Sequence, residues 1–131
     1  MDDRRLAMYI ARTRVGFGLA LIVAPRAALR PWFGSMVDAR IAGPLGRMTG
    51  GRDALLGAGT AIALGERNGG ANWLSMLALA DAVDAAVFLT APGVRWRGRL
   101  LGAFAAASAV THFQLARRVA RADALPVGDS S

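Results

Sequence analysis

The chain has 131 residues, 54% of them hydrophobic, and its mean hydropathy is +0.36. This composition is too apolar for an ordinary soluble domain of that length, so we expect lipid to be its solvent. With no cysteine and a single histidine, the chain cannot form disulfides, thiolate sites or a zinc site built from cysteine or several histidines, and the sequence indicates no cofactor.

The charge is strongly positive, yet its placement argues against nucleic acid. The net charge is +7, the sequence pI is about 11.7, and all 16 basic residues are arginine. Clustered arginines neutralise phosphates in nucleic-acid-binding proteins. Here they flank apolar runs, where cations meet anionic headgroups, as at Arg4, Arg5, Arg95, Arg97, Arg99, Arg117, Arg118 and Arg121. We therefore predict membrane lipids as partners, and no nucleic acid.

Four apolar stretches follow in chain order: Leu6 to Ala24, about Gly50 to Gly65, Trp73 to Ala91, and Leu100 to Ala116. Segments of roughly 17 to 25 residues cross a bilayer as helices. The third and fourth are the clearest, whereas arginines interrupt the first and the second has an uncharged run only from Ala54 to Gly65. The sequence thus predicts an all-α fold, a four-helix transmembrane bundle over residues 1–121. Because all basic residues are arginine and eight of the nine acidic residues are aspartate, a bias expected from a GC-rich bacterial genome, we expect a multi-pass protein of a bacterial inner membrane.

The connections differ in length. Pro25 to Pro44 is long and mixes cationic with aromatic residues, which predicts a loop in the membrane interface. Glu66 to Asn72 and Pro92 to Arg99 are short, which predicts antiparallel neighbouring helices. The tail, residues 122–131, is predicted to be disordered.

Two structural alternatives stay open. Arg14 and the ten-residue apolar run after it resemble a signal peptide, but Arg26 stands where a cleavage site needs a small residue, so we treat the segment as a mature helix. A soluble four-helix bundle would need more polar positions. Orientation is undecided, because six arginines on the side of the termini face seven on the other.

Ionisable residues within the apolar stretches are the candidate site, because charges at membrane depth are costly and face a protein interior or a wet cavity. They are Arg12, Arg14, Arg52, Asp53, Asp81, Asp84 and His112. The three arginines balance the three aspartates, which predicts internal pairing. The depth of each residue follows from counting along its helix from the side of the membrane that holds the two termini, at about 1.5 Å per residue. This count predicts one layer with Arg12, Arg14, Asp81 and His112, and another with Arg52, Asp53 and Asp84.

Helical periodicity assigns these residues to faces. Leu77, Asp81, Asp84 and Phe88 share one stripe, as do Ser108, Thr111, His112 and Leu115. The stripe of Gly50, Asp53, Gly57 and Ala61 is mostly small, which predicts close helix packing.

Three functions are compatible with this pattern. In the first, Asp81, Asp84, Arg52 and Asp53 bind a lipophilic small molecule or convert it by acid/base chemistry (isomerisation, cyclisation or epoxide opening), supported by Arg12, Arg14 and His112. It predicts a cavity among the helices, and whether the protein is an enzyme stays open. In the second, the protein is a non-catalytic membrane subunit or scaffold whose ion pairs are structural. The third, a proton-coupled transporter, would require a homo-oligomer.

The Arg52-Asp53-x-x-x-Gly57 signature and the Asp81-x-x-Asp84 pair resemble an uncharacterised family of small four-span membrane proteins common in actinobacteria. The resemblance covers most of the chain. It implies the four-span topology and a bacterial source, and it implies no activity.

Overall fold

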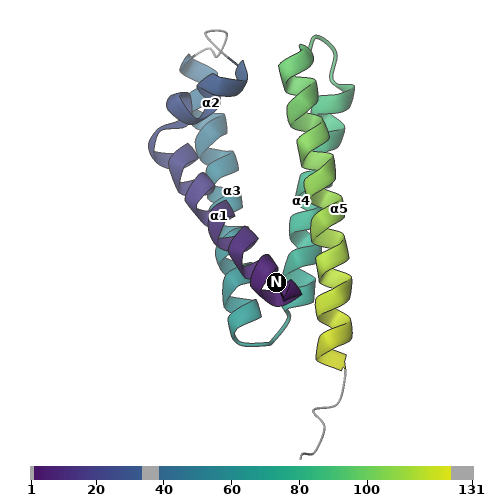
Figure 1. Ribbon diagram of the computed structural model, residues 1–131. Coiled ribbons are helices and arrows are strands. Elements are labelled where there is room, and N and C mark those ends of the chain that lie inside the picture. The colour runs from purple at the N-terminus through teal and green to yellow at the C-terminus, as the bar shows by residue number, and fades with distance from the viewer. Residues whose placement is uncertain (1, 34–38, 125–131) are drawn as a thin grey trace, which may run out of the picture.

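The computed structural model describes residues 2–33 and 39–124, which form five helices (Figure 1). They are α1 (Asp3–Val23), α2 (Pro25–Phe33), α3 (Ala39–Gly65), α4 (Gly70–Thr90) and α5 (Trp96–Ala124). No strand occurs in the described residues, so the predicted all-α class is confirmed. Helix α5 continues three residues past the predicted start of the tail, and the rest of that tail, residues 125–131, lies outside the described residues.

Local chemistry sets several helix ends. Helix α1 begins after Asp2, whose carboxylate accepts a hydrogen bond from the backbone N–H of Arg4 at 3.4 Å, as a helix N-cap does. Gly69 lies directly before α4 with a φ of +71°, a left-handed conformation that glycine adopts without strain. This residue completes the short turn between α3 and α4, so these two helices run antiparallel as predicted (Figure 1).

The segment from Pro25 to Pro44 is mainly helical, and the predicted loop is wrong. Helix α2 occupies its first part, and α3 begins at Ala39, so Pro44 lies inside a helix. Glycine and proline are loop signals, but Gly46 allows α3 to lie directly against α2: a Cβ on Gly46 would lie only 2.6 Å from the Cβ of Pro25. Tertiary packing therefore overrides local propensity.

The helices form two pairs. Helix α1 packs along α3, and α4 packs along α5, while fewer contacts join one pair to the other. The α1–α3 approach depends on glycines, because a Cβ on Gly18 would lie 2.6 Å from the carbonyl oxygen of Gly50, and one on Gly57 would lie 2.8 Å from that of Ala11. The predicted close-packing face of α3 is thus confirmed.

The two pairs meet near the α3–α4 turn and diverge toward α2 (Figure 1). Near the turn a small apolar core joins them, formed by Ala7, Leu64, Leu74, Leu77, Leu115, Ala116 and Val119. Toward the other end, Phe33 of α2 meets Phe88 of α4 with ring centroids 6.1 Å apart. The middle of the interface is left to polar groups.

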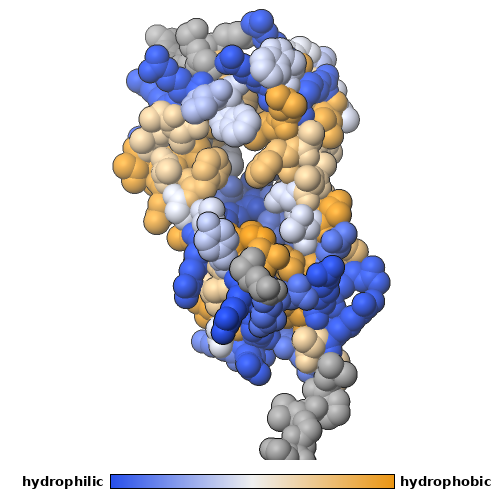
Figure 2. Space-filling view, in the orientation of Figure 1, coloured by the Kyte–Doolittle hydropathy of each residue, from blue (hydrophilic) through white to orange (hydrophobic). Residues whose placement is uncertain are grey.

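Large apolar side chains are exposed on each long helix. Tyr9, Leu55, Leu79 and Phe104, one from each, are 67% to 73% exposed. Hydrophobic residues cover much of the middle and upper surface in Figure 2, and hydrophilic ones gather at both ends. Among the described helices, α1 and α4 are long and apolar enough to cross a membrane. Helix α5, expected to be among the clearest, falls short because arginines bound its uncharged run, which itself contains His112 and Gln114.

Candidate functional site

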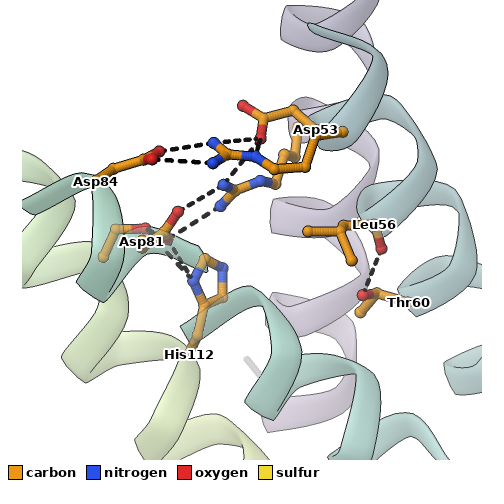
Figure 3. A network of polar contacts seen from close by, with 9 residues as sticks. Asp53, Leu56, Thr60, Asp81, Asp84 and His112 are labelled. Atoms are coloured by element: carbon orange, nitrogen blue, oxygen red, sulfur yellow. Dashed lines mark hydrogen bonds and ion pairs between the residues drawn. The ribbon is translucent and has the colours of Figure 1, made fainter. Parts of the chain in front are cut away.

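A single polar network joins the two helix pairs at mid-length (Figure 3). It contains six of the seven ionisable residues singled out in the sequence. Arg14 comes from α1, Arg52 and Asp53 from α3, Asp81 and Asp84 from α4, and His112 from α5. The structure therefore contains the predicted internal pairing of these charges.

Asp81 is the centre of the inner layer. Arg14 donates to both of its oxygens, from Nη2 at 2.5 Å and from Nη1 at 3.0 Å. The Oδ2 atom also accepts from the Ser108 hydroxyl at 2.6 Å and contacts His112 Nδ1 at 3.0 Å. Two-point pairing with a guanidinium is the strongest geometry for a carboxylate. Asp81 is thereby held in one orientation by three side chains.

Arg52 and Asp84 form the outer layer. Arg52 donates from Nη1 and Nη2 to the two oxygens of Asp84, at 2.9 and 2.6 Å. Asp53 links the layers, because its Oδ1 accepts from Arg52 and also from Arg14, the latter at 3.2 Å. The second oxygen of Asp53 points away from both guanidinium groups (Figure 3). The two predicted depth layers are both present, and Asp53 connects them.

Arg12 does not join its predicted layer. It is exposed and makes no hydrogen bond or ion pair with the described residues. Residues two apart on a helix lie on different faces, so Arg12 and Arg14 cannot both face α4. Without Arg12, two arginines face three aspartates, and the network carries a net charge of −1 when His112 is neutral.

Burial divides the network. The side chains of Arg14, Asp53, Asp81 and His112 are at most 12% exposed, whereas Arg52 and Asp84 are 34% and 31% exposed. Figure 2 shows a hollow between the two helix pairs with hydrophilic surface at its floor. The accessible end of the network is therefore the Arg52–Asp84 pair.

Two buried nitrogens have no hydrogen-bond partner among the described residues, Arg14 Nε and His112 Nε2. An ionised carboxylate only accepts hydrogen bonds, so His112 must carry a proton on Nδ1 to bond Asp81. In neutral His112, Nε2 is then an acceptor. It points away from Asp81 toward the side of the network where Leu56 and Thr60 lie (Figure 3).

The chemistry open to each carboxylate follows from these contacts. Asp81 is fully engaged by donors, so it is poorly placed to accept a further proton or donor. Asp84 is the most accessible network carboxylate, and Asp53 has an oxygen that no described residue bonds. Both can accept a hydrogen bond from a bound molecule. Arginine stays protonated, so Arg52 can stabilise an anion but cannot act as a base.

Ser108 was not singled out as a site residue, although its hydroxyl makes one of the shortest contacts to Asp81. The signal was in the sequence: Ser108 lies four residues before His112 on the same helical stripe, so the two side chains reach the same carboxylate.

Two cavities lined by described residues lie at opposite ends of the molecule. One of about 560 Å³ is lined by residues of α1, α2 and α3, and one of about 220 Å³ lies beside residues near both termini. No network residue lines either cavity. Among the described residues, no group of three or more histidine, cysteine, aspartate or glutamate side chains is placed to hold a metal ion. No protein-family model, curated protein or solved structure matches the chain.

Proposed function

We propose that this chain is a multi-pass membrane protein that binds a lipophilic cation between its two helix pairs, at the accessible Arg52–Asp84 end of the ionic network. In this proposal α1, α3, α4 and α5 cross a bacterial inner membrane. The observation that carries the ligand proposal is the charge of the network with His112 neutral, two arginines against three aspartates, combined with the exposure of one pair at its edge.

The surface supports the membrane location. Many large apolar side chains are exposed along all four long helices, and so much exposed apolar surface is costly in water and favourable against lipid. Helices α1 and α4 meet the length and hydropathy expected of spans. The shared Arg-Asp-x-x-x-Gly and Asp-x-x-Asp patterns lead us to propose membership of the small four-span actinobacterial family as well.

Single-cysteine labelling tests the topology cleanly, because the native chain has no cysteine. Leu79→Cys and Val110→Cys replace side chains that are 67% and 57% exposed near the middle of α4 and α5. In membrane vesicles we expect a water-soluble maleimide to leave both unlabelled, because lipid covers them. Asn68→Cys and Pro92→Cys, in the two turns, should label from opposite sides of the membrane.

The soluble-bundle alternative predicts the reverse at mid-helix. If Leu79→Cys and Val110→Cys label as fast as Asn68→Cys in intact vesicles, the helices do not cross the bilayer. If Asn68→Cys and Pro92→Cys label from the same side, the number of spans is wrong. Detergent-solubilised, denatured protein provides the control that every cysteine can react.

The ligand class follows from charge and burial. An uncompensated charge in a low-dielectric site is costly, so a positive group arriving at the network would be stabilised there. Asp84 and the unbonded oxygen of Asp53 are the acceptors available to it. The apolar flanks of the hollow suit a lipophilic body (Figure 2). If the bound molecule is also converted by acid/base chemistry, Asp84 is the carboxylate we propose to exchange the proton.

Tetraphenylphosphonium and tetraphenylborate, a cation and an anion of similar size and shape, are a matched pair of probes. We expect tetraphenylphosphonium to raise the melting temperature of the purified protein in detergent, and tetraphenylborate to have no such effect. At a concentration 100 times its Kd, a ligand adds about 2.7 kcal/mol to the free energy of unfolding. Equal shifts with both probes would contradict the proposal, since they would reflect partition into the micelle.

Two substitutions should change the affinity in opposite directions. Asp84→Asn removes the negative excess and should weaken tetraphenylphosphonium binding about tenfold or more, while Arg52→Gln increases the excess and should strengthen it. Asp3→Asn is the control, because this half-exposed carboxylate pairs with Arg118 far from the network. Loss of affinity in both Asp84→Asn and Arg52→Gln would point to a structural role instead.

The scaffold hypothesis is the second candidate, and a specific observation favours it: each arginine and aspartate of the network has at least one partner, and no network residue lines either cavity. It predicts no selective binding of either probe. The transporter hypothesis has less support, because the three carboxylates belong to one cluster at mid-length and do not form a path along the helices (Figure 3).

A further inference from the structure

The larger cavity lies where α1 ends. Its volume is about 560 Å³, and it is lined by residues 23–27 of α1, α2 and their junction, and by Gly43, Pro44 and Arg47 of α3. The α2–α3 side of this cavity is fixed by the tight contact of Pro25 with Gly46. The apolar lining includes Val23, Ala24 and Pro25, and Val23 is 79% exposed.

Two arginines give the cavity a positive charge. Arg47 is held by its Nε, which donates to the carbonyl oxygen of Ile22 at 3.3 Å, and its terminal nitrogens make no bond to the described residues. Arg26 makes no hydrogen bond or ion pair with the described residues. Residues 24–33 and 39–51 contain no carboxylate, while Asp38 lies outside the described residues. The two guanidinium groups thus lack a described counter-ion.

The position of the cavity suits an amphipathic anion. Helix α2 is amphipathic: Pro25 is buried against α3 and Phe33 contacts α4, while Arg26 and Arg30 are exposed. Such a helix lies at the level of lipid headgroups, beside the apolar end of α1. A cationic pocket at that level contacts lipid phosphate groups. The exposed apolar side chain of Val23 directly beside it contacts acyl chains.

We propose that this cavity binds one anionic phospholipid, whose phosphate lies between Arg26 and Arg47 and whose acyl chains run along Val23 and the exposed face of α1. The site rests on the membrane location proposed above and is independent of the cation site at Arg52 and Asp84. It would join the end of α1 and the start of α2 to α3.

Native mass spectrometry of the full-length protein in detergent tests the site. The probes are phosphatidylglycerol and phosphatidylcholine with the same acyl chains, added at equal concentration. We expect one phosphatidylglycerol to be retained, with at least tenfold preference over phosphatidylcholine. Arg26→Gln/Arg47→Gln should lose this adduct tenfold or more, whereas Arg30→Gln/Arg97→Gln, which removes the same charge at the same end outside the cavity, should keep it.

A second variant leaves the charge unchanged. A Cβ on Gly43 would meet no atom within 4 Å, so Gly43→Leu should fold normally, occupy the cavity and displace the lipid. Melting temperatures within a few degrees of wild type would establish that all variants are folded.

The proposal is overturned if both double variants lose phosphatidylglycerol equally, which indicates general charge attraction, or if Gly43→Leu and Arg26→Gln/Arg47→Gln bind it like wild type. Displacement of the lipid by millimolar inorganic phosphate would identify a site for free phosphate instead. Failure here leaves cysteine labelling and tetraphenylphosphonium binding unaffected, so the two proposals fail separately.

Discussion

Asp81→Asn is expected to destabilise the protein more than the removal of any other carboxylate in the network. Asp81 is 4% exposed and is bonded by Arg14, Ser108 and His112. Asparagine at this position is uncharged, so among the described residues the guanidinium of Arg14 would keep one ion pair, with Asp53 at 3.2 Å. Breaking one side of a buried ion pair typically costs about 3 to 5 kcal/mol. Thermal melting in detergent, followed by circular dichroism, measures the loss.

Asp84→Asn is the matched control, being the same substitution one helical turn along α4. Its carboxylate is 31% exposed, and exposed ion pairs contribute roughly 0 to 1 kcal/mol. The melting temperature should therefore fall much less. The double variant Arg14→Gln/Asp81→Asn should lose less than the sum of its single variants, because neither charge is then left unpaired. Equal melting temperatures for Asp81→Asn and Asp84→Asn would show that the inner layer is not what holds the helix pairs together.

The network could be predicted from the sequence because helical geometry fixes two coordinates of each residue. Depth follows from the rise per residue, and face follows from the spacing of three and four residues. These rules group Arg14 with Asp81 and His112, and Arg52 with Asp84, without any information on packing. Arg12 was misplaced because its depth was used without its face.

The start of α3 could not be predicted in the same way. Gly43, Pro44, Gly46 and Gly50 are all loop signals in isolation. Gly46 and Gly50 are in fact contact points, where a second helix approaches the backbone closely. A single sequence does not distinguish a glycine that breaks a helix from one that allows another helix to approach.

Some flanking arginines also have roles that composition does not reveal. Arg99 donates to the carbonyl oxygens of Phe88, Leu89 and Ala91 at the end of α4. Arg4 donates to the carbonyl oxygen of Leu64 at the end of α3 and pairs with Asp123. The last carbonyls of a helix lack partners within it, and a cation there is favourable. These two arginines therefore complete helix ends, as Arg47 does at Ile22 of α1, whereas Arg26 only lines a cavity.

Gly50→Ala is expected to separate α1 from α3, while Gly51→Ala, one residue along, should be tolerated. A Cβ on Gly50 would lie 2.5 Å from the carbonyl oxygen of Gly18 and 2.7 Å from the Cβ of Leu21, whereas one on Gly51 would meet no atom within 4 Å. Backbone cannot yield as a flexible side chain can, so we expect Gly50→Ala to cost about 1 to 3 kcal/mol or more, the usual range for overpacking. Gly51→Ala should add roughly 0.5 to 1 kcal/mol, because alanine favours a helix over glycine.

The same comparison tests whether helix packing sets the geometry of the network. Arg14 and Asp53 belong to α1 and α3, and their 3.2 Å contact requires the close approach that the glycines permit. Gly50→Ala should therefore weaken tetraphenylphosphonium binding as well as stability, although it changes no charge. Gly51→Ala should leave that binding at the wild-type level. If Gly50→Ala lowers the melting temperature and binding is unchanged, the cation site does not depend on the α1–α3 spacing, and Arg52 and Asp84 alone would form it.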